Sequence, residues 1–400
     1  MSVTAAVAAA LRQHHSSSAM AWEQARTLAQ RLPAPLGTQD VPLDQAAGRT
    51  LGQPLTAAAM LPGFDNAAMD GYAVCGPGPW HVIGCTLAGT RAAGPLTPGE
   101  AVEIATGAPV PAGTDRVVQY EIVSRTGSLI TAPDGDRCHI RRAGEYIDAG
   151  QQLLPAGSIL TAAALGLAAS AGIDAVTVRT QPSVRVLVTG DEIVTAGIPS
   201  HGRVRDAIGP VITALLKAWD VASPQLRWLP DRPADALTAA VAGSLSDVDV
   251  TIVCGSSSVG PADGLHDTLH TTGATVHVDG VACRPGHPQL LASAGQHWLV
   301  GVPGNPFAAL VAAYTLVQPL LAGLAGRTLP EPPEVQFRGK ALPAPGVTRL
   351  LPVQWRQGEA HLIHGARPGY LGPAAQADAL AVLPPTWQPG ETVQLLMMPL

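Results

Sequence analysis

The middle of the chain alternates short apolar runs with helical patterns, which is typical of a βαβ fold. Mostly apolar runs occupy residues 184–188, 248–253 and 298–302. Runs of this kind are typical of parallel strands that are buried on both faces. Apolar residues at helical spacing predict helices over about 208–219 and 234–245. The sequence therefore predicts an α/β domain with a parallel sheet.

Each apolar run ends in a loop of small or polar residues. The first run, interrupted by Arg185, stops at Thr189 and Gly190, and the carboxylates Asp191 and Glu192 follow at once. Ligands of open α/β sheets bind outside the carboxyl ends of the strands. We therefore expect the loops to meet at one sheet edge as a binding site, although a simple turn with two solvated acids would show the same residues.

The other two loops contain small residues that would let a ligand approach the backbone. The second run leads into Cys254-Gly-Ser-Ser-Ser-Val-Gly260, with Asp263 just beyond, and the third leads into Pro303-Gly-Asn-Pro306. Backbone N–H groups of a small-residue loop can bind an anion. The second loop lacks the lysine of a Walker A sequence and does not fit the glycine pattern of dinucleotide-binding domains.

A stretch without charge runs from Pro306 to Gly326, over 21 residues. Asn305 and Pro306 suit the start of a helix, and apolar residues follow at helical spacing. We interpret the stretch as a buried helix of the α/β domain, although its length would also suit a membrane span.

The two ends of the chain have a different pattern. A helix is predicted over 19–32, followed by extended structure over 41–56 and by short strands separated by glycine and proline up to about residue 150. A helix over 161–171 and a strand over 173–178 then return the chain to its first domain. These patterns indicate a β-rich domain inserted in another domain. Beyond residue 329, short strands at 334–337 and 350–355 predict a further small β domain.

Composition excludes several classes of protein. Hydrophobic residues make up 46% of the 400 residues and charged residues 14%, which excludes a disordered chain. The net charge of −6 argues against nucleic-acid binding. The five cysteines show no C-x-x-C spacing, so a disulfide framework or zinc site is not expected, and a reducing cytosol fits better. The N-terminus lacks the basic region of a signal peptide. We therefore expect a cytoplasmic protein.

Two loops in the first half of the chain contain candidate chemistry. Pro62-Gly-Phe-Asp-Asn-Ala-Ala-Met-Asp-Gly-Tyr-Ala-Val74 has more polar and large residues than a tight turn requires. Thr106-Gly-Ala-Pro-Val-Pro111 places a hydroxyl beside a stretch stiffened by two prolines. Arg141 and Arg142 could bind an anion or pair with surface acids, and the second outcome is more common. A tight turn and a stiff loop remain alternatives for the first two.

The first of these loops closely resembles the signature loop of the MoeA family, the molybdopterin molybdenumtransferases related to the gephyrin E domain. The resemblance covers about residues 20–400. Four further motifs match in the same order: Thr106–Pro111, Thr189–Glu192, Ser258-Val-Gly260 with Asp263, and Pro303–Pro306.

The resemblance implies an elongated, multidomain α/β protomer that forms a homodimer, with the active site at the dimer cleft. It implies four parts: a discontinuous linker domain at 1–50 and 151–180, an inserted β-rich domain at 51–150, a molybdopterin-binding α/β domain at 181–328, and a C-terminal β-barrel at 329–400.

The resemblance also implies an activity. The family inserts molybdate into adenylylated molybdopterin with Mg²⁺ and releases AMP, which is the last step of molybdenum cofactor biosynthesis. Both substrates are anions, so an acidic site requires a divalent cation that bridges carboxylates and phosphates. The molybdopterin adenylyltransferase and molybdoenzyme apoproteins are further partners that the resemblance suggests, whereas nucleic acid and membrane are not expected.

Motif matching assigns roles to particular residues. The residues expected to bind the metal, molybdate and pyrophosphate are Asp65, Thr106, Glu192, Asp206 and Asp263. Of these, Glu192, Asp206 and Asp263 are the expected metal ligands. The expected substrate-binding residues are Thr189, Gly190, Asp191, Gly255, Ser256, Ser258, Val259, Gly260, Arg284, His287, Pro303, Gly304, Asn305 and Pro306.

The sequence departs from the family pattern at four positions. Ser256 replaces a glycine, His287 replaces the second lysine of Lys-Pro-Gly-Lys-Pro, Ile208 replaces an asparagine, and Tyr146 replaces an aspartate. Each change removes a special backbone freedom or a polar partner near the presumed ligand. An active insertase is the favoured interpretation because the acidic residues are kept. A non-catalytic molybdopterin-binding paralogue or scaffold, and less so an adenylyltransferase, remain alternatives.

Overall fold

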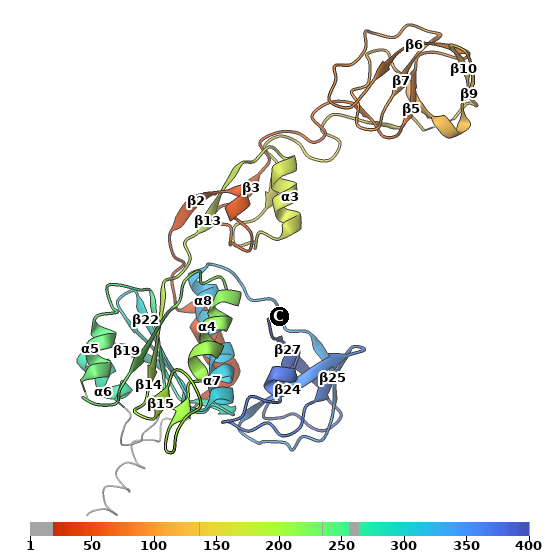
Figure 1. Cartoon of the computed structure of the whole chain (residues 1–400). Coiled ribbons are helices and arrows are strands. Elements are labelled where there is room, and N and C mark those ends of the chain that lie inside the picture. The colour runs from red at the N-terminus through yellow and green to blue at the C-terminus, as the bar shows by residue number, and fades with distance from the viewer. Residues whose placement is uncertain (1–18, 136, 234, 256–263, 400) are drawn as a thin grey trace, which may run out of the picture. The chain divides into compact units, whose positions relative to one another are not determined.

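A computed structural model describes residues 19–135, 137–233, 235–255 and 264–399 (Figure 1). The chain forms two compact units, one made of Gln39–Val178 and the other of the chain up to Thr38 together with Arg179–Leu400. Each unit has its own sheets and cores.

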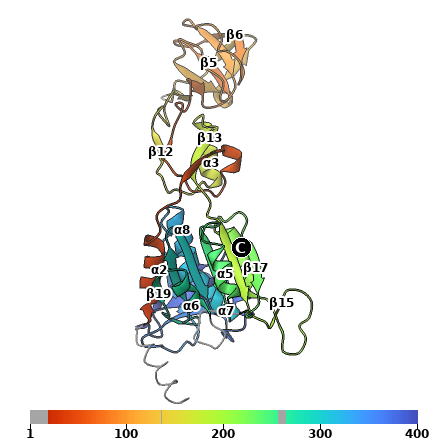
Figure 2. The same ribbon diagram turned by 90° about the vertical axis from the view of Figure 1, so that its left-hand side faces the viewer.

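The larger unit is built on a six-stranded, mostly parallel sheet (Figure 2). Its strands, in spatial order, are β17 (Gln225–Leu229), β14 (Val184–Thr189), β18 (Val250–Cys254), β22 (His297–Val302), β21 (Leu290–Ala294) and β19 (Thr275–Asp279). The first four are parallel, and β21 runs antiparallel to both of its neighbours. The predicted parallel α/β sheet is confirmed.

Helices cover both faces of this sheet, which explains the apolar runs. Val184, Val186 and Val188 of β14 face one core, and Leu187 faces the other. The first core lies under α2 (Trp22–Arg31), α4 (Ile208–Ala218), α7 (Pro306–Ala312) and α8 (Gln318–Leu324), and the second lies under α5 (Ala236–Ala242) and α6 (Leu265–Thr271) (Figure 1). Strand residues that point to either face of the sheet are therefore buried.

The charge-free stretch is a core helix, as predicted. It consists of α7, a π-helical segment at Ala313–Val317, and α8. Among the described residues it is the one helix long and apolar enough to cross a membrane. Of its most apolar 18-residue segment, 89% is buried inside the protein. Its contacts with the rest of the unit account for that apolar surface.

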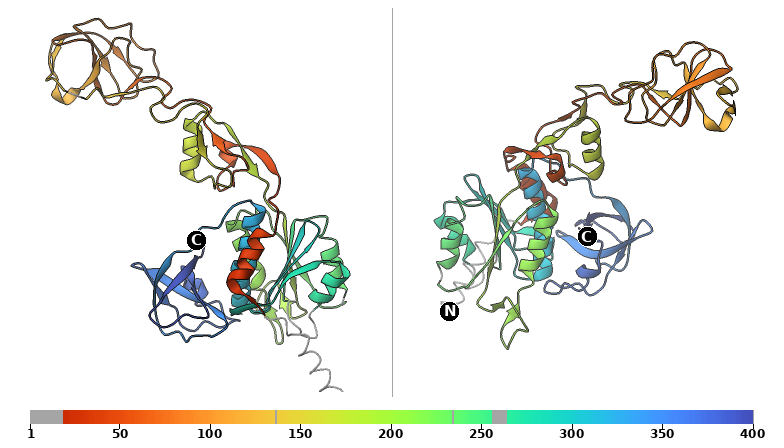
Figure 3. Two further views of the ribbon diagram at one scale, coloured as in Figure 1. Left: turned by 180° about the vertical axis from the view of Figure 1, so that it is seen from behind. Right: turned by 45° about the horizontal axis from the view of Figure 1, so that its top comes forward.

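Helix α2 lies along α8 (Figure 3, left). Its Trp22 Nε1 donates a hydrogen bond of 3.0 Å to Thr315 Oγ1, and Arg26 donates to the carbonyl of Tyr314. The chain before Thr38 therefore groups with the larger unit, although the predicted linker domain extended over residues 1–50. The four-part division of the chain stays a prediction.

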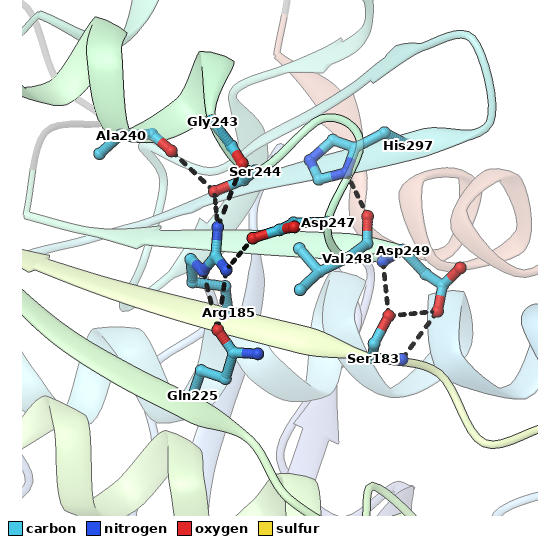
Figure 4. Close-up of polar contacts among 10 residues, drawn as sticks. All are labelled: Ser183, Arg185, Gln225, Ala240, Gly243, Ser244, Asp247, Val248, Asp249 and His297. Atoms are coloured by element: carbon cyan, nitrogen blue, oxygen red, sulfur yellow. Dashed lines mark hydrogen bonds and ion pairs between the residues drawn. The ribbon is translucent and has the colours of Figure 1, made fainter.

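Arg185 interrupts the first apolar run, and its neighbours in the sequence do not explain why a charged residue stands there. Its side chain is 3% exposed and donates hydrogen bonds to Ser244 Oγ at 2.9 Å, Gln225 Oε1 at 2.8 Å and Asp247 Oδ2 at 2.8 Å (Figure 4). The guanidinium is buried because these partners satisfy its donors. The ion pair also lowers the pKa of Asp247.

The C-terminal part of the larger unit is a closed five-stranded barrel, as expected. Its strands pair in the order β24–β25–β23–β27–β26 and back to β24. They are β23 (Glu334–Arg338), β24 (Thr348–Arg356), β25 (Glu359–Leu362), β26 (Ala379–Leu383) and β27 (Thr392–Met397).

The smaller unit contains a second six-stranded sheet. Its strands, in spatial order, are β8 (Arg116–Gln119), β5 (Gly71–Val74), β7 (Glu100–Ile104), β6 (Trp80–Thr86), β10 (Leu129–Thr131) and β9 (Ser124–Thr126). Strand β8 ends at Gln119. A 3₁₀ turn starts at Tyr120, whose ring packs edge-on against Tyr72 and whose hydroxyl donates to Glu103.

The rest of the smaller unit surrounds the predicted helix, which is α3 (Ala162–Ser170), capped by Thr161. The extended stretch predicted over 41–56 is only partly strand. It is broken by a 3₁₀ turn at Leu43–Gln45. The strands beside α3 form two antiparallel pairs: β2 (Thr38–Pro42) with β13 (Ala175–Arg179), and β3 (Leu55–Thr56) with β12 (Gln152–Leu154).

Candidate functional site

The three strands whose loops were predicted to converge, β14, β18 and β22, are parallel neighbours, so their carboxyl ends lie at the same edge of the sheet. Thr189 Oγ1 donates a hydrogen bond of 3.1 Å to the carbonyl of Cys254, and Gly255 N donates one of 3.1 Å to the carbonyl of Val302. A Cβ placed on Gly304 would lie 3.5 Å from the Cα of Gly255. The strand ends are therefore joined to one another by hydrogen bonds.

Glycine is required at two of these strand ends. Gly190 and Gly255 have φ angles of 143° and 109°, which residues other than glycine rarely adopt. A Cβ on Gly255 would lie 3.0 Å from Thr189 Oγ1, and one on Gly190 would lie 2.7 Å from Glu192 Oε2. The backbone is thus left open beside the acidic side chain.

A cavity of about 540 Å³ opens at this edge of the sheet. Three carboxylates line it, those of Glu192, Asp206 and Asp231. Its wall also contains the expected residues Thr189, Gly190, Gly255, Gly304, Asn305 and Pro306. A pocket of this size suits a small-molecule ligand.

Asp206 is the buried member of the acidic set, at 7% exposure. Its Oδ1 accepts hydrogen bonds from the backbone N–H groups of Ile208 at 3.0 Å and Gly209 at 2.9 Å, and its Oδ2 accepts one of 2.9 Å from Trp228 Nε1. The carboxylate therefore holds the first turn of α4 in place. Any further role for Asp206 has to share these oxygens.

Asp191 and Asp231 join two loops to each other. Asp191 N donates to Asp231 Oδ2 at 3.3 Å, and Asp231 N donates to Asp191 Oδ1 at 3.1 Å. Asp231 was not predicted, although it follows the end of β17 as Asp191 follows β14. The signal was available, because β17 is a parallel neighbour of β14 and its carboxyl end reaches the same sheet edge.

Two of the three predicted metal ligands, Glu192 and Asp206, line the acidic cavity. Among the described residues, no group of three or more His, Cys, Asp or Glu is arranged so that it could hold a metal ion. The predicted residues Ser256, Ser258, Val259, Gly260 and Asp263 lie outside the described residues.

Arg284 and His287 line a different cavity, of about 610 Å³. Arg349 and Arg367 line it too, and His287 Nδ1 lies 2.9 Å from the carbonyl oxygen of Val281. Pro303, by contrast, is buried at the end of β22. The structure therefore places these predicted substrate-binding residues outside the lining of the acidic cavity.

The smaller unit brings together the loops of Asp65 and Thr106. Val110 N donates to the carbonyl of Asp65 at 3.0 Å, and Gly107 N donates to the carbonyl of Ala67 at 2.9 Å. Thr106 N donates to Asp70 Oδ1 at 2.8 Å. Both loops are thus fixed relative to each other.

Asp65 is an ionised carboxylate. Its Oδ1 accepts a hydrogen bond of 2.8 Å from Ala143 N, and its Oδ2 accepts one of 2.6 Å from Arg142 Nη1. The Ala143 N–H and then the Arg142 guanidinium lower the pKa of this carboxyl. Arg142 therefore pairs with an acid, the outcome that the sequence favoured. Tyr146 is 54% exposed nearby in the chain.

The geometry defines a ligand-binding α/β domain attached to a β-barrel, in a chain with a separate β-rich unit. Comparisons with known proteins agree. The family described as MoeA N-terminal region (domain I and II) matches residues 20–172, and the probable molybdopterin binding domain family matches residues 185–323.

Similar proteins and solved structures identify the family within this class. The chain is 36% identical to the molybdopterin molybdenumtransferase of Haemophilus influenzae, over 76% of this chain and 78% of that protein, and 32% identical to that of Nostoc sp., over 89% and 87%. A crystal structure of the molybdopterin biosynthesis MoeA protein of Pyrococcus horikoshii covers 95% of this chain and 99% of its own, with 25% identity and a TM-score of 0.77. A second crystal structure, described as a MoeA protein of Pyrococcus horikoshii, reaches a TM-score of 0.81 at 22% identity, over 95% of this chain and 100% of its own, and supports the fold. The chain belongs to the molybdopterin molybdenumtransferase family.

Proposed function

We propose that this protein inserts molybdate into adenylylated molybdopterin and releases AMP, as the last step of molybdenum cofactor biosynthesis. The observation that carries the proposal is the acidic cavity at the carboxyl ends of β14, β18 and β22. It combines the carboxylate of Glu192 with glycines at positions 190 and 255, whose missing side chains let a ligand approach the backbone closely.

Mg²⁺ fits the side chains of this cavity in one particular way. In proteins, Mg²⁺ is usually bound through one or two carboxylates, with water and substrate phosphates as the other ligands. Glu192 is exposed and Asp231 is half-buried on the cavity wall, so they can supply those carboxylates. Asp206 already has three hydrogen-bond donors on its oxygens and would support them through the start of α4. Such an ion would neutralise the pyrophosphate of the substrate.

The chain's own groups then bind and orient the substrate. The carboxylates of Glu192 and Asp231 repel a bare phosphate, so they select a ligand that brings a cation with it. The N–H groups of both strand-end glycines already donate to neighbouring backbone carbonyls, so these glycines give the ligand space rather than hydrogen-bond donors. Arg284 and His287 are proposed to bind an anionic group of a substrate from the neighbouring cavity, where Arg349 and Arg367 add positive charge.

Asp65 and Thr106 are proposed to act in the same reaction. Because Arg142 and Ala143 keep Asp65 ionised, it can orient a cationic group or a metal-bound ligand but cannot donate a proton near neutral pH. The family resemblance predicts that they act as part of a homodimer, in the cytoplasm, and that the chain meets the adenylyltransferase and molybdoenzyme apoproteins.

The direct test supplies purified protein with adenylylated molybdopterin, Mg²⁺ and molybdate and measures AMP release. Release above the rate without protein supports the proposal. No release, alongside a family member that works under the same conditions, would leave a molybdopterin carrier or scaffold as the function. The substitutions at Tyr146 and Ile208 would then be the first positions to examine.

The dimer prediction has its own test. Asp65→Ala and Glu192→Ala chains, each inactive alone, are mixed, refolded and assayed for AMP release. If one site takes Asp65 from one chain and Glu192 from another, mixed dimers recover up to half of the wild-type activity per dimer. No recovery, with mixed dimers demonstrated by affinity tags, would show that both residues act within one chain.

A further inference from the structure

A third cavity adjoins the acidic one and has a different wall. It measures about 510 Å³ and shares Gly190 and Ile193 with the acidic cavity. Trp228, Arg203 and Asp191 also line it. An aromatic ring and a guanidinium thus stand directly beside the proposed phosphate site.

The indole of Trp228 is exposed but fixed. It is 44% exposed at the end of the edge strand β17, where a large apolar ring is costly to leave in water. Its Nε1 donates to the buried carboxylate of Asp206, which in turn holds the first turn of α4. The ring is therefore held in one orientation with part of its surface uncovered.

Arg203 adds a second planar group. Its Nη1 donates a hydrogen bond of 2.5 Å to the carbonyl of Asp191, which ties the guanidinium to the loop beside the cavity. Exposed indole and guanidinium surfaces bind planar heteroaromatic rings by stacking. Acidic side chains alone would not do so.

We propose that Trp228, with Arg203, forms a stacking site for a planar heteroaromatic ring of the substrate, next to the cavity that binds its phosphates. This inference rests on the proposed function, whose substrate contains two such rings, an adenine and a pterin. Trp228 would then contribute to substrate specificity, and its hydrogen bond to Asp206 would link ring binding to the acidic cavity.

The test measures binding directly, with AMP in one arm and a 6-substituted pterin in the other, without molybdate. Trp228→Leu removes the ring and should weaken binding of the ring that stacks there on the order of tenfold. Trp228→Phe keeps an aromatic face and should stay within about threefold. Loss with AMP alone identifies adenine, loss with the pterin alone identifies the pterin, and unchanged binding of both overturns the proposal.

Trp355→Leu provides the matched control, because Trp355 is 43% exposed on β24 of the barrel. An equal loss in this variant would overturn the proposal. Should Trp228→Leu fail to fold, tryptophan fluorescence gives a second reading. A stacked ring should quench the wild-type emission, and Trp228→Phe should lack that quenching. Quenching that persists in Trp228→Phe would also overturn the proposal.

The outcome is independent of the insertase assay. If wild-type protein releases AMP and Trp228→Leu binds both rings normally, the stacking site is wrong and the proposed function stands. If no AMP is released but Trp228→Leu binds one ring more weakly, the protein is a carrier with a stacking site.

Discussion

At the amino ends of β14, β18 and β22, polar side chains bond to one another, whereas at the carboxyl ends of the same strands they line a cavity. Asp249 Oδ2 accepts from Ser183 N at 2.7 Å, and Ser183 Oγ accepts from Asp249 N at 2.9 Å (Figure 4). Arg185 is bonded to three side chains at this end. Glu192 and Asp231, at the other end, line the acidic cavity.

The difference shows how polar groups with similar chemistry serve opposite purposes. Closed networks stabilise the fold because each buried donor has a partner. Carboxylates beside a cavity keep oxygen atoms available for a ligand, so they contribute less to the free energy of unfolding. Substitutions at the amino ends should mainly change stability, and substitutions at the carboxyl ends should mainly change activity.

The largest effect is expected for Glu192→Gln. The amide keeps the size of the side chain but loses its charge, so AMP release should fall on the order of 10²–10³-fold, as for loss of one electrostatic group at a reacting centre. The melting temperature should not fall, because Glu192 is exposed. Initial rates and thermal unfolding measure the two outcomes.

Asp247→Asn is the matched control at the amino end. It should leave the rate of AMP release unchanged while it weakens the pair with Arg185. A rate for Glu192→Gln within about threefold of wild type, or an equal loss in Asp247→Asn, would contradict the assignment of the acidic cavity as the site of chemistry.

Arg185→Leu should have the next largest effect, on stability. It removes buried hydrogen bonds to Ser244 and Gln225, so we expect a loss on the order of 2–4 kcal/mol in the free energy of unfolding. Hydrogen exchange of the β14 amides in the full chain reports this loss locally. Arg338→Leu removes an exposed pair with Glu359 and should cost less than about 1 kcal/mol. Equal costs would mean that the buried network adds nothing.

Gly255→Ala should change both properties. The new Cβ meets Thr189 at 3.0 Å in a backbone conformation with φ of 109°, which costs on the order of 1–3 kcal/mol and moves the strand end at the cavity. Gly273→Ala is the control, with φ of 66° and no atom within 4 Å of the new Cβ. We expect it to cost about 1 kcal/mol without changing AMP release. Unchanged melting temperature and rate in Gly255→Ala would argue against a tightly packed strand end.

The smallest effect concerns His297 at the amino end of β22. Burial lowers the pKa of this imidazole, whose Nδ1 lies 2.7 Å from the carbonyl oxygen of Val248. The folded state thus favours the neutral ring. Its stabilising contribution is complete above the unfolded value of about 6.5 and is lost as the pH falls toward the lower folded pKa.

Melting temperatures measured between pH 7.5 and 5.5 check this expectation. The decrease on acidification should be smaller in His297→Asn than in wild type, because asparagine does not titrate. His270→Asn, at an exposed position at the end of α6, should follow the wild-type decrease. Identical pH profiles for wild type and His297→Asn would rule out a titrating role for His297.

Much of the α/β sheet was predictable because burial on both faces leaves a strong signal. Val184, Val186 and Val188 could only be buried, and glycine at position 190 marked the end of the strand. The partners of Arg185 could not be predicted, because Gln225, Ser244 and Asp247 approach it only after three elements pack together. Trp228 gave no local signal either, since its exposed side depends on which strand forms the edge of the sheet.

The sequence by itself determined where the apolar strands end, which residues follow them, and the family to which these motifs belong. Those features are local, because strand burial and loop chemistry depend on residues that are neighbours in the sequence. The tertiary structure alone decided that Asp206 contacts Trp228, that Asp231 joins the acidic cavity, and that Arg284 and His287 line a separate one. These outcomes depend on side chains distant in sequence, whose positions are set by packing and by the need to satisfy buried polar groups.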